Sequence, residues 1–173
     1  MITVISGTNR PENNSILVAK NYLEKIEDQG IESSLLNLEY FDASFYFTSS
    51  YGEVPLSFEQ IVKDQILSAT HFVFVVPEYN GGFPGILKFF IDTLPPDIWK
   101  GKKAALVGVA TGRSGNQRGL DHLTAVLHYL KMEVYSAKPL LSAIHNSLNE
   151  EGEIINEEYI KLIQDQLDNF KKF

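Results

Sequence analysis

Hydroxyl, amide and guanidinium side chains crowd the segment that follows the first apolar run of the chain. The sequence SGTNRPENNS, residues 6–15, carries Thr8, Arg10, Asn14 and Ser15 among its polar residues. Such donors, together with the amino-terminal end of a following helix, surround an anion well, and a terminal phosphate monoester offers them three free oxygens. The segment therefore predicts a phosphate site. A loop whose Asn and Ser residues only cap the helix would have the same composition, so this alternative stays open.

A second cluster is the sequence PEYNGGFPG, residues 77–85. Its glycines let the backbone approach a ligand closely, and its prolines hold the shape of the loop. Tyr79 supplies an aromatic face or a phenol, Asn80 supplies donors and an acceptor, and Glu78 supplies a charge or a structural hydrogen-bond acceptor. We expect this loop to present peptide groups to the edge of a flat heterocycle. The alternative is a plain turn in which Tyr79 only covers the core.

A third cluster, TGRSGN at residues 111–116, comes close to the G-x-S-x-G pattern of a hydrolase nucleophile, but Asn116 stands in place of the last glycine. A hydrolase built on Ser114 stays a minor alternative, because no histidine and acid are evident as its partners. Neither GxxxxGK[ST] nor GxGxxG follows a strand, which disfavours nucleoside triphosphate hydrolysis and the usual dinucleotide mode. The four histidines lack metal-ligand spacing, so we expect no metal site.

The composition is that of one folded domain, with 173 residues of which 44% are hydrophobic. A formal charge of -7 disfavours nucleic acid and anionic membrane surfaces as partners. The chain has no cysteine, which excludes disulfides, thiolate nucleophiles and cysteine-based metal sites. It also has neither a signal-like start nor an apolar run of membrane-spanning length, and we expect a cytoplasmic protein.

Five short apolar runs alternate with five helical patterns along the chain. The expected strands are 2–6, 32–38, 71–76, 103–110 and 133–141, and the expected helices are 15–29, 57–69, 84–94, 120–130 and 156–172. This alternation predicts a doubly wound α/β fold with a parallel sheet of order 2-1-3-4-5 and helices on both faces. Ligands bind such sheets beyond the carboxyl ends of strands one and three. We therefore expect the first loop (residues 7–14), the second loop (77–83) and the third loop (111–116) to meet there.

Three segments of the chain resemble a known family. The sequence PEYNGGFPGILKFFIDTL is similar to the PEYN-x-S-x-P-G-x-L-K-N-x-I-D segment of the NADPH-dependent FMN reductases, a flavodoxin-like group that includes quinone, azo-dye and chromate reductases. SGTNRPENNS resembles the G-S-x-R loop of that family, and LNEEGEIINEEYIKLIQDQL resembles its last turn and helix. The similarity runs through the chain in order. It implies a flavodoxin-like three-layer sandwich in which residues 1–173 form a single FMN-binding domain.

The resemblance also implies which residues bind the FMN cofactor. Those expected to hold the phosphate are Thr8, Arg10, Asn14 and Ser15; those lining the isoalloxazine ring are Pro77, Glu78, Tyr79 and Asn80; those forming the wall after the fourth strand are Gly112, Arg113, Ser114 and Gly115. No catalytic residue is expected from the protein, because flavin itself carries the redox chemistry.

By the same resemblance, the chain is an NAD(P)H-dependent oxidoreductase. A reduced nicotinamide, NADPH or NADH, would give a hydride to FMN, and the electrons would pass to a quinone, azo compound, metal ion or free flavin. The alternative is a non-enzymatic electron carrier or FMN-binding module of the flavodoxin type, which the missing T-x-T-G-x-T loop disfavours. The family commonly forms homodimers or homotetramers.

Three positions depart from the family pattern. Gly82 replaces a serine, Phe89 replaces an asparagine, and Asn116 breaks a double glycine; these departures leave the nicotinamide preference and the acceptor pocket open. Several aromatic residues could either form an oligomer interface with Phe89 or cover the protein's own core. They are Tyr40, Phe41, Phe45, Tyr46, Phe47 and Tyr51.

Overall fold

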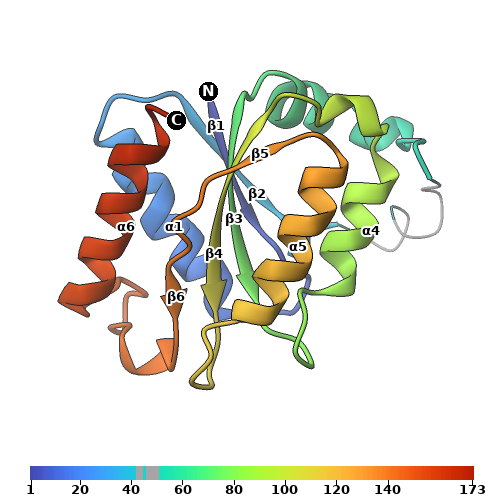
Figure 1. The fold of residues 1–173 in the computed structure, drawn as a ribbon. Coiled ribbons are helices and arrows are strands. Elements are labelled where there is room, and N and C mark those ends of the chain that lie inside the picture. Colours follow the sequence, from blue (N-terminus) through green and yellow to red (C-terminus); the bar gives the residue numbers. More distant parts are fainter. Residues whose placement is uncertain (42–44, 46–50) are drawn as a thin grey trace.

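A parallel sheet forms the centre of the protein (Figure 1). The computed structural model describes residues 1–41, 45 and 51–173. In this part of the chain the strands are β1 (Ile2–Ser6), β2 (Ser33–Asn37), β3 (His71–Pro77), β4 (Lys103–Val109), β5 (Glu133–Val134) and β6 (Leu140–Leu141). Their order is β2-β1-β3-β4-β5, with β6 also paired to β4. The predicted fold class and strand order are confirmed.

The predicted fifth strand, 133–141, is wrong as a continuous element, because it consists of two strands of two residues. β5 pairs with the beginning of β4, and β6 pairs with its end. Between them Gln166 reaches in from the last helix, and its Nε2 donates to the carbonyl oxygens of Leu106 at 3.1 Å and Ala137 at 2.9 Å. A side-chain amide thus takes backbone acceptors that a continuous ladder would use. Pro139, which has no amide hydrogen, is also unable to donate to a ladder.

Helices cover both faces of the sheet (Figure 1). One face carries α1 (Asn14–Glu27) and α6 (Glu157–Phe170), and the other carries α4 (Gly85–Thr93) and α5 (Gln117–Tyr129). The remaining described helical pieces are η1 (Leu38–Tyr40), η2 (Leu56–Phe58), α3 (Glu59–Ile61), η3 (Val62–Leu67), η4 (Pro96–Ile98) and η5 (Ile144–Asn146). Among the described helices, none is long and apolar enough to cross a membrane.

The predicted helix 57–69 is not one regular α-helix. It consists of a 3-10 turn, a single α-turn and a π-helix that ends at Leu67. The Nζ of Lys102 donates to the carbonyl oxygens of Ile66 at 2.8 Å and Ala69 at 2.5 Å. The lysine thereby satisfies carbonyl groups that the end of the helix leaves without partners, and burial lowers the pKa of Lys102.

Alternate residues of β3 point into two separate cores. Phe72, Phe74 and Val76 pack beneath α4 and α5, whereas Val73 and Val75 pack beneath α1 and α6. All five side chains are fully buried. A central parallel strand is covered on both faces, which is why its sequence is apolar without alternation. The two cores hold β1 and β3 side by side and thereby fix where their carboxyl ends lie.

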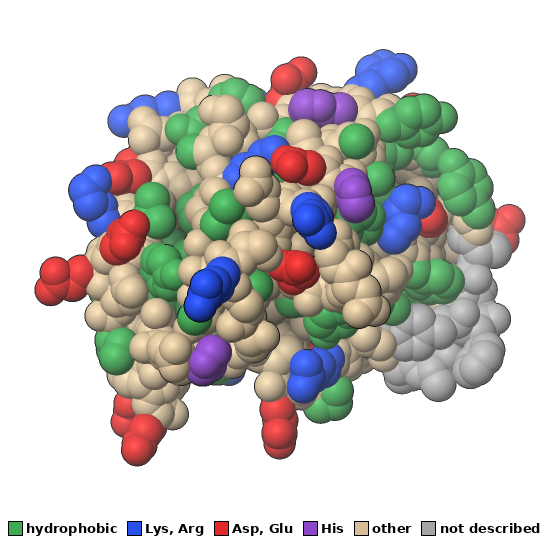
Figure 2. Space-filling model, turned by 60° about the horizontal axis from the view of Figure 1, so that its bottom comes forward, with side chains coloured by type: hydrophobic (Ala, Val, Ile, Leu, Met, Phe, Trp, Pro, Cys, Tyr) green, Lys and Arg blue, Asp and Glu red, His purple; other side chains and the backbone are tan. Residues whose placement is uncertain are grey.

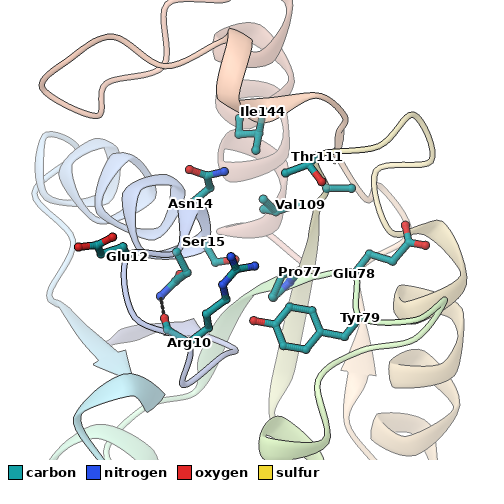
Figure 3. A pocket seen from close by; sticks show the side chains of 12 residues that line it. Arg10, Glu12, Asn14, Ser15, Pro77, Glu78, Tyr79, Val109, Thr111 and Ile144 are labelled. Carbon is teal, nitrogen blue, oxygen red and sulfur yellow. Dashed lines mark hydrogen bonds between the residues drawn. The ribbon is translucent and has the colours of Figure 1, made fainter.

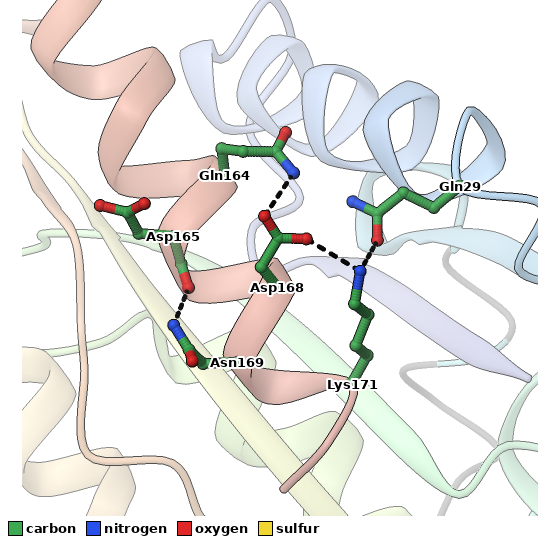
Figure 4. Close-up of polar contacts among 6 residues, drawn as sticks. All are labelled: Gln29, Gln164, Asp165, Asp168, Asn169 and Lys171. Carbon is green, nitrogen blue, oxygen red and sulfur yellow. Dashed lines mark hydrogen bonds and ion pairs between the residues drawn. The ribbon is translucent and has the colours of Figure 1, made fainter.

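A polar bridge joins α6 to the end of α1 on one face of the sheet (Figure 4). The Nζ of Lys171 donates to Gln29 Oε1 and to Asp168 Oδ1, both at 2.8 Å. The Nε2 of Gln164 donates to the other oxygen of Asp168 at 3.1 Å. The bond from Lys171 and then that from Gln164 lower the pKa of Asp168. Because these groups are largely exposed, the bridge orients the helix end rather than stabilising the core.

Some of the aromatic residues that could form an oligomer interface instead cover the protein's own core. Phe41 and Phe45 are buried, and their rings lie 4.5 and 4.4 Å from that of Phe58. Phe89 is partly buried and its ring lies 5.7 Å from that of Phe45. For these residues the core alternative is confirmed. Tyr40 and Tyr51 are exposed, and Tyr46 and Phe47 lie outside the described residues.

Candidate functional site

A cavity of about 160 Å³ opens at the carboxyl-terminal edge of the sheet. It lies where the chain leaves β1 toward α1 on one face and β3 toward α4 on the other, which is the place where doubly wound sheets bind ligands. Figure 3 shows side chains converging on it from both directions. It is lined by Arg10, Glu12, Asn13, Asn14, Ser15, Pro77, Glu78, Tyr79, Val109, Ala110, Thr111 and Ile144.

The first loop delivers the amino-terminal end of α1 to this cavity. α1 begins at Asn14, and the Oδ1 of the preceding Asn13 accepts a hydrogen bond from the amide of Ile16 at 2.8 Å. Asn13 therefore has the capping role that the sequence left open. The amides of Asn14 and Ser15 have no acceptor inside the helix, because the first turn lacks preceding carbonyl groups. Two backbone donors and the positive end of the helix dipole thus face the cavity.

Arg10 adds a full positive charge to the same wall. Its side chain extends into the cavity between α1 and Tyr79 (Figure 3). Within the described residues, no hydrogen bond or ion pair joins its guanidinium to another side chain. Glu12 also lines the cavity, but its carboxylate points away from Pro77 and Tyr79 in the same view. The first loop therefore offers donors and charge to an anion.

A hydrogen bond between two hydroxyl groups ties the first loop to the second. Thr8 Oγ1 and Tyr79 OH lie 2.6 Å apart, and the amide of Arg10 donates to Thr8 Oγ1 at 3.2 Å. Thr8 is fully buried and does not line the cavity. A hydroxyl can donate one bond and accept two, so Thr8 can order both loops at once. Its place in this structure is behind Tyr79 rather than at the cavity surface.

The second loop is a tight hairpin at the end of β3. Tyr79 and Gly82 exchange both backbone hydrogen bonds, at 2.9 and 3.0 Å. Between them Asn80 and Gly81 have φ angles of 52° and 77°. Two-residue hairpin turns of this type need positive φ at both central positions, and Asn-Gly is the pair that adopts it most readily. The turn therefore follows from Asn80 and Gly81, and it holds the ring of Tyr79 in the cavity wall.

A second cavity of about 260 Å³ adjoins the first. The two share Glu78, Ala110 and Thr111 as lining residues. Ser114 Oγ donates a hydrogen bond to the carboxylate of Glu78 and so joins the third loop to the second. The partner of Ser114 is a carboxylate and not a histidine, so the serine hydrolase alternative has no support here.

Asn116 fixes the base of the third loop. It is fully buried with a φ of 70°, and its Nδ2 donates to the carbonyl oxygen of Val76 at 2.9 Å. Asparagine tolerates this left-handed backbone better than other residues with a Cβ. Asn116 therefore supplies a conformation that glycine would also supply, and it adds a hydrogen bond to the end of β3. The departure from the double glycine has a structural explanation.

The structure brings most of the predicted site residues together. Arg10, Asn14, Ser15, Pro77, Glu78 and Tyr79 line the first cavity, and Asn80, Gly112 and Ser114 line the second. Thr8, Arg113 and Gly115 line neither; a Cβ on Gly115 would lie 2.6 Å from Leu140, so this glycine serves close packing.

Sequence reasoning missed several lining residues. Val109 ends β4 and Ala110 follows it, and the rule for parallel sheets would have placed both at this edge. Ile144 follows β6 and gave no local signal. Among the described residues, no group of three or more histidine, aspartate or glutamate side chains could hold a metal ion.

Comparison with known proteins identifies sequence relatives of the chain. The model of the family described as NADPH-dependent FMN reductase matches residues 1–146. An NAD(P)H-dependent FMN reductase of Pseudomonas aeruginosa is 34% identical over 110 residues, which are 61% of this chain and 59% of that protein. A 2-hydroxy-1,4-benzoquinone reductase of a Burkholderia species is 30% identical over 130 residues, 72% of this chain and 68% of that protein. The matched segment thus spans about three fifths to two thirds of these relatives.

Solved structures share the fold over nearly the whole chain. The flavoenzyme FerB, an NAD(P)H:acceptor oxidoreductase of Paracoccus denitrificans, superposes with a TM-score of 0.77 at 23% identity, covering 98% of this chain and 93% of that one. The apo form of an NADH:FMN oxidoreductase gives a TM-score of 0.74 at 17% identity, covering 99% and 88%. At these identities the structural likeness concerns the fold alone.

Proposed function

Since the chain belongs to the NADPH-dependent FMN reductase family, we propose that its cavity binds FMN and that the protein catalyses electron transfer from NADPH or NADH to a small acceptor. The observation that carries the proposal is the cavity at the switch point of the sheet, with an anion-binding wall on one side and a hairpin bearing an aromatic ring on the other. The acceptor would be a quinone, an azo compound, a metal ion or free flavin.

The first loop fits the phosphate group of FMN. A phosphate monoester carries about two negative charges and three acceptor oxygens. The amides of Asn14 and Ser15, the hydroxyl of Ser15 and the guanidinium of Arg10 supply donors of different directions along one wall. Charge-assisted bonds of this kind are short and strong, and arginine binds phosphate in bidentate geometry. Thr8 would support the loop from behind through Tyr79.

The second and third loops fit the edge of a planar ring. Pro77, Glu78 and Tyr79 of the second loop line the cavity together with Ala110 and Thr111, which follow β4. The hairpin holds backbone groups of the second loop in a fixed position, while the bond from Ser114 holds the Glu78 carboxylate against the third loop. We propose that Pro77 to Asn80 contact the ring and that the backbone of Gly112 to Gly115 forms the wall beside it.

When bound, FMN would accept a hydride from the nicotinamide and pass electrons to the acceptor. The protein would bind the cofactor, orient its ring and exclude water from the site. Arg10 and the end of α1 would anchor one end of the cofactor, and the hairpin would fix the ring against the end of β4. Holding two reactants in contact lowers the barrier by removing the entropy cost of their encounter. No side chain is assigned as a nucleophile or as a general base.

The test is a titration of flavin-free protein with FMN, followed by quenching of flavin fluorescence, with riboflavin in parallel. We expect FMN to bind much more tightly than riboflavin, because only FMN carries the phosphate that the first loop would hold. Equal affinity for both would contradict the phosphate site. Failure of both to bind would contradict the FMN proposal.

A second experiment separates an enzyme from an electron carrier. The FMN-loaded protein is mixed with excess NADPH or NADH in the absence of oxygen, and the flavin absorbance is followed. Rapid bleaching by either nucleotide is expected. A flavin that responds only to a one-electron chemical reductant, and never to nicotinamides, would favour the flavodoxin-type carrier instead.

We also propose that the protein works in the cytoplasm as a homodimer or homotetramer. Support for the oligomer comes from Tyr40, Tyr51 and Leu56, whose side chains are 79%, 74% and 84% exposed. Large apolar side chains are exposed on association surfaces more often than elsewhere on a soluble protein. Analytical ultracentrifugation of the FMN-loaded protein tests this, and sedimentation as a monomer at micromolar concentration would contradict it.

A further inference from the structure

All three arginines of the chain lie in loops or turns that meet at the carboxyl-terminal edge of the sheet. Arg10 is in the first loop, Arg113 is in the third loop, and Arg118 is in the first turn of α5. The chain has 22 acidic residues, yet no ion pair or side-chain hydrogen bond of these guanidinium groups occurs in the described part of the structure. Arg10 has a proposed ligand, the phosphate of FMN. Arg113 and Arg118 have none.

Arg118 and His122 face the tip of the second loop. The Nη1 of Arg118 lies 3.9 Å from the position that a Cβ on Gly81 would occupy, and the Nδ1 of His122 lies 3.9 Å from the corresponding position on Gly82. The two side chains are four residues apart on α5, so they share one helix face. Because Gly81 and Gly82 have no side chains, nothing beyond their own backbone stands between the hairpin and these donors.

These donors stand beside the second cavity rather than the first. Gly81 lines the second cavity, and so do Gly112 and Ser114, the neighbours of Arg113. Figure 3 shows Arg10 and Glu78 on opposite sides of the first cavity, and Glu78 is one of the three residues that both cavities share. Arg118 approaches Gly81 and does not line the first cavity, where Arg10 and the amino-terminal end of α1 lie. A phosphate bound in the first cavity therefore leaves the donors beside the second cavity available to a second anion.

Among the described residues, no acidic group forms an ion pair with Arg118. The Glu78 carboxylate accepts the hydroxyl of Ser114, and Asp121, which follows on α5, lies 4.0 Å from the Nζ of Lys138. Elsewhere on this edge of the molecule, basic, acidic and histidine side chains are interspersed without one dominant sign (Figure 2). Attraction of an anion to the second cavity must then come from local contacts and not from a broad positive surface.

We propose that Arg118, with His122 and Arg113 beside it, binds a phosphate group of the reduced nicotinamide dinucleotide. This inference rests on the proposed function, because a hydride donor has to contact the flavin and the second cavity adjoins the one assigned to FMN. Arginine is suited to the pyrophosphate and to a 2′-phosphate alike. If Arg118 binds the 2′-phosphate, it sets the preference for NADPH over NADH. If it binds the pyrophosphate, it strengthens the binding of NADPH and of NADH equally.

Substitution Arg118→Gln tests the proposal in the FMN-loaded protein of 173 residues. Isothermal titration measures the dissociation constants of 2′,5′-ADP and 5′-ADP, and steady-state kinetics give KM for NADPH and NADH. We expect a weakening of about tenfold, as for loss of one charge-assisted hydrogen bond at an exposed site. Weakening confined to NADPH and 2′,5′-ADP assigns the 2′-phosphate, and weakening of both nucleotides and of 5′-ADP assigns the pyrophosphate.

Two matched variants make the result specific. Lys100→Gln removes the same charge near the amino-terminal end of β4, at the opposite edge of the sheet. This variant should bind NADPH and NADH with unchanged affinity. Arg118→Lys keeps the charge without the bidentate fork and should recover part of the affinity. Unchanged binding of all four probes in Arg118→Gln would overturn the inference.

The failure of this inference and that of the proposed function are distinguishable. If FMN does not bind, the proposed function fails, whereas 2′,5′-ADP can still be titrated into the flavin-free protein and its Arg118→Gln variant. If FMN binds and nicotinamides bleach it with the same KM in wild type and variant, the proposed function stands and only the role of Arg118 is lost.

Discussion

Substitutions of Asn116 test whether this residue replaces glycine by combining a backbone conformation with a hydrogen bond. Its φ is 70°, its side chain is fully buried, and its Nδ2 donates to the Val76 carbonyl at 2.9 Å. Asn116→Gly keeps the conformation and loses the bond. Asn116→Ala loses the bond and also forces a residue with a Cβ into a left-handed backbone. Asn116→Asp keeps tolerance of that backbone but loses the donor and buries a charge.

The magnitudes follow from these differences. A buried carbonyl left without a donor costs about 1–3 kcal/mol. Alanine at positive φ costs roughly 1–2 kcal/mol more, whereas glycine costs roughly 0.5–1 kcal/mol through the larger freedom of the unfolded chain. The free energy of unfolding should therefore be highest for wild type, lower for Asn116→Gly and lower again for Asn116→Ala, with about 0.5–1 kcal/mol between the two variants. In a chain of this length that gap corresponds to about 1–4 °C in Tm.

Urea unfolding of the flavin-free protein, followed by far-ultraviolet circular dichroism, measures the three variants against wild type. The aspartate variant should be the least stable, because it places an uncompensated charge against the Val76 carbonyl. An alanine variant as stable as wild type would refute both parts of the reasoning. An alanine variant more stable than the glycine variant would refute the argument from backbone conformation, but not the argument from the hydrogen bond. FMN affinity of the glycine variant then reports whether the third loop keeps its position.

Three further outcomes are expected. Arg10→Gln should raise the dissociation constant of FMN roughly 10- to 100-fold and change that of riboflavin less than about twofold, because a charge-assisted bond to the phosphate is lost; an equal change in both would contradict the assignment. Burial, then the charges of Lys103 and the amino terminus, lower the pKa of His71 from its usual 6.5. The contribution of His71 to stability is therefore fully present above pH 6.5 and is lost as the pH falls below this value. The urea midpoint of His71→Gln should vary less between about pH 7.5 and pH 5 than that of wild type. Gly82→Ser should change stability by less than about 0.5 kcal/mol, since a Cβ there meets its nearest neighbour at 3.8 Å, whereas Gly81→Ala, at a φ of 77°, should cost about 1 kcal/mol or more on a thermal melt.

The fold was readable from sequence because its determinants are local and repeated. The apolar runs 71–76 and 103–110 are covered on both faces of the sheet, so almost all of their consecutive residues are apolar. Proline marked the limits of α4, which begins after Pro84 and ends before Pro95. The broken fifth strand was not readable, because the break depends on Gln166, whose acceptor Leu106 lies 60 residues away.

The site was readable to the extent that the topology alone places it. The carboxyl ends of β1, β3 and β4 had to meet at one edge, and the loops that follow them carry most of the lining residues. The hydrogen-bond partners of individual side chains could not be predicted in this way. Thr8 was expected to face the ligand, but its hydroxyl contacts Tyr79, 71 residues later, and this choice depends on packing that no local pattern records.

The net charge illustrates the same division between global and local information. A charge of -7 disfavours nucleic acid and anionic membranes as partners, because their charges act at a distance over a large surface. The proposed ligands are themselves anions, but they bind at contact distance, inside the Debye length of about 8–10 Å over which individual guanidinium groups dominate the field. Arginine is the rarer basic residue in this chain, with three of the 15 basic side chains, and all three occur where the loops converge. A binding site for two phosphorylated cofactors can therefore exist on an acidic protein, provided that its arginines, unlike Lys171 and Lys88, are left without acidic partners.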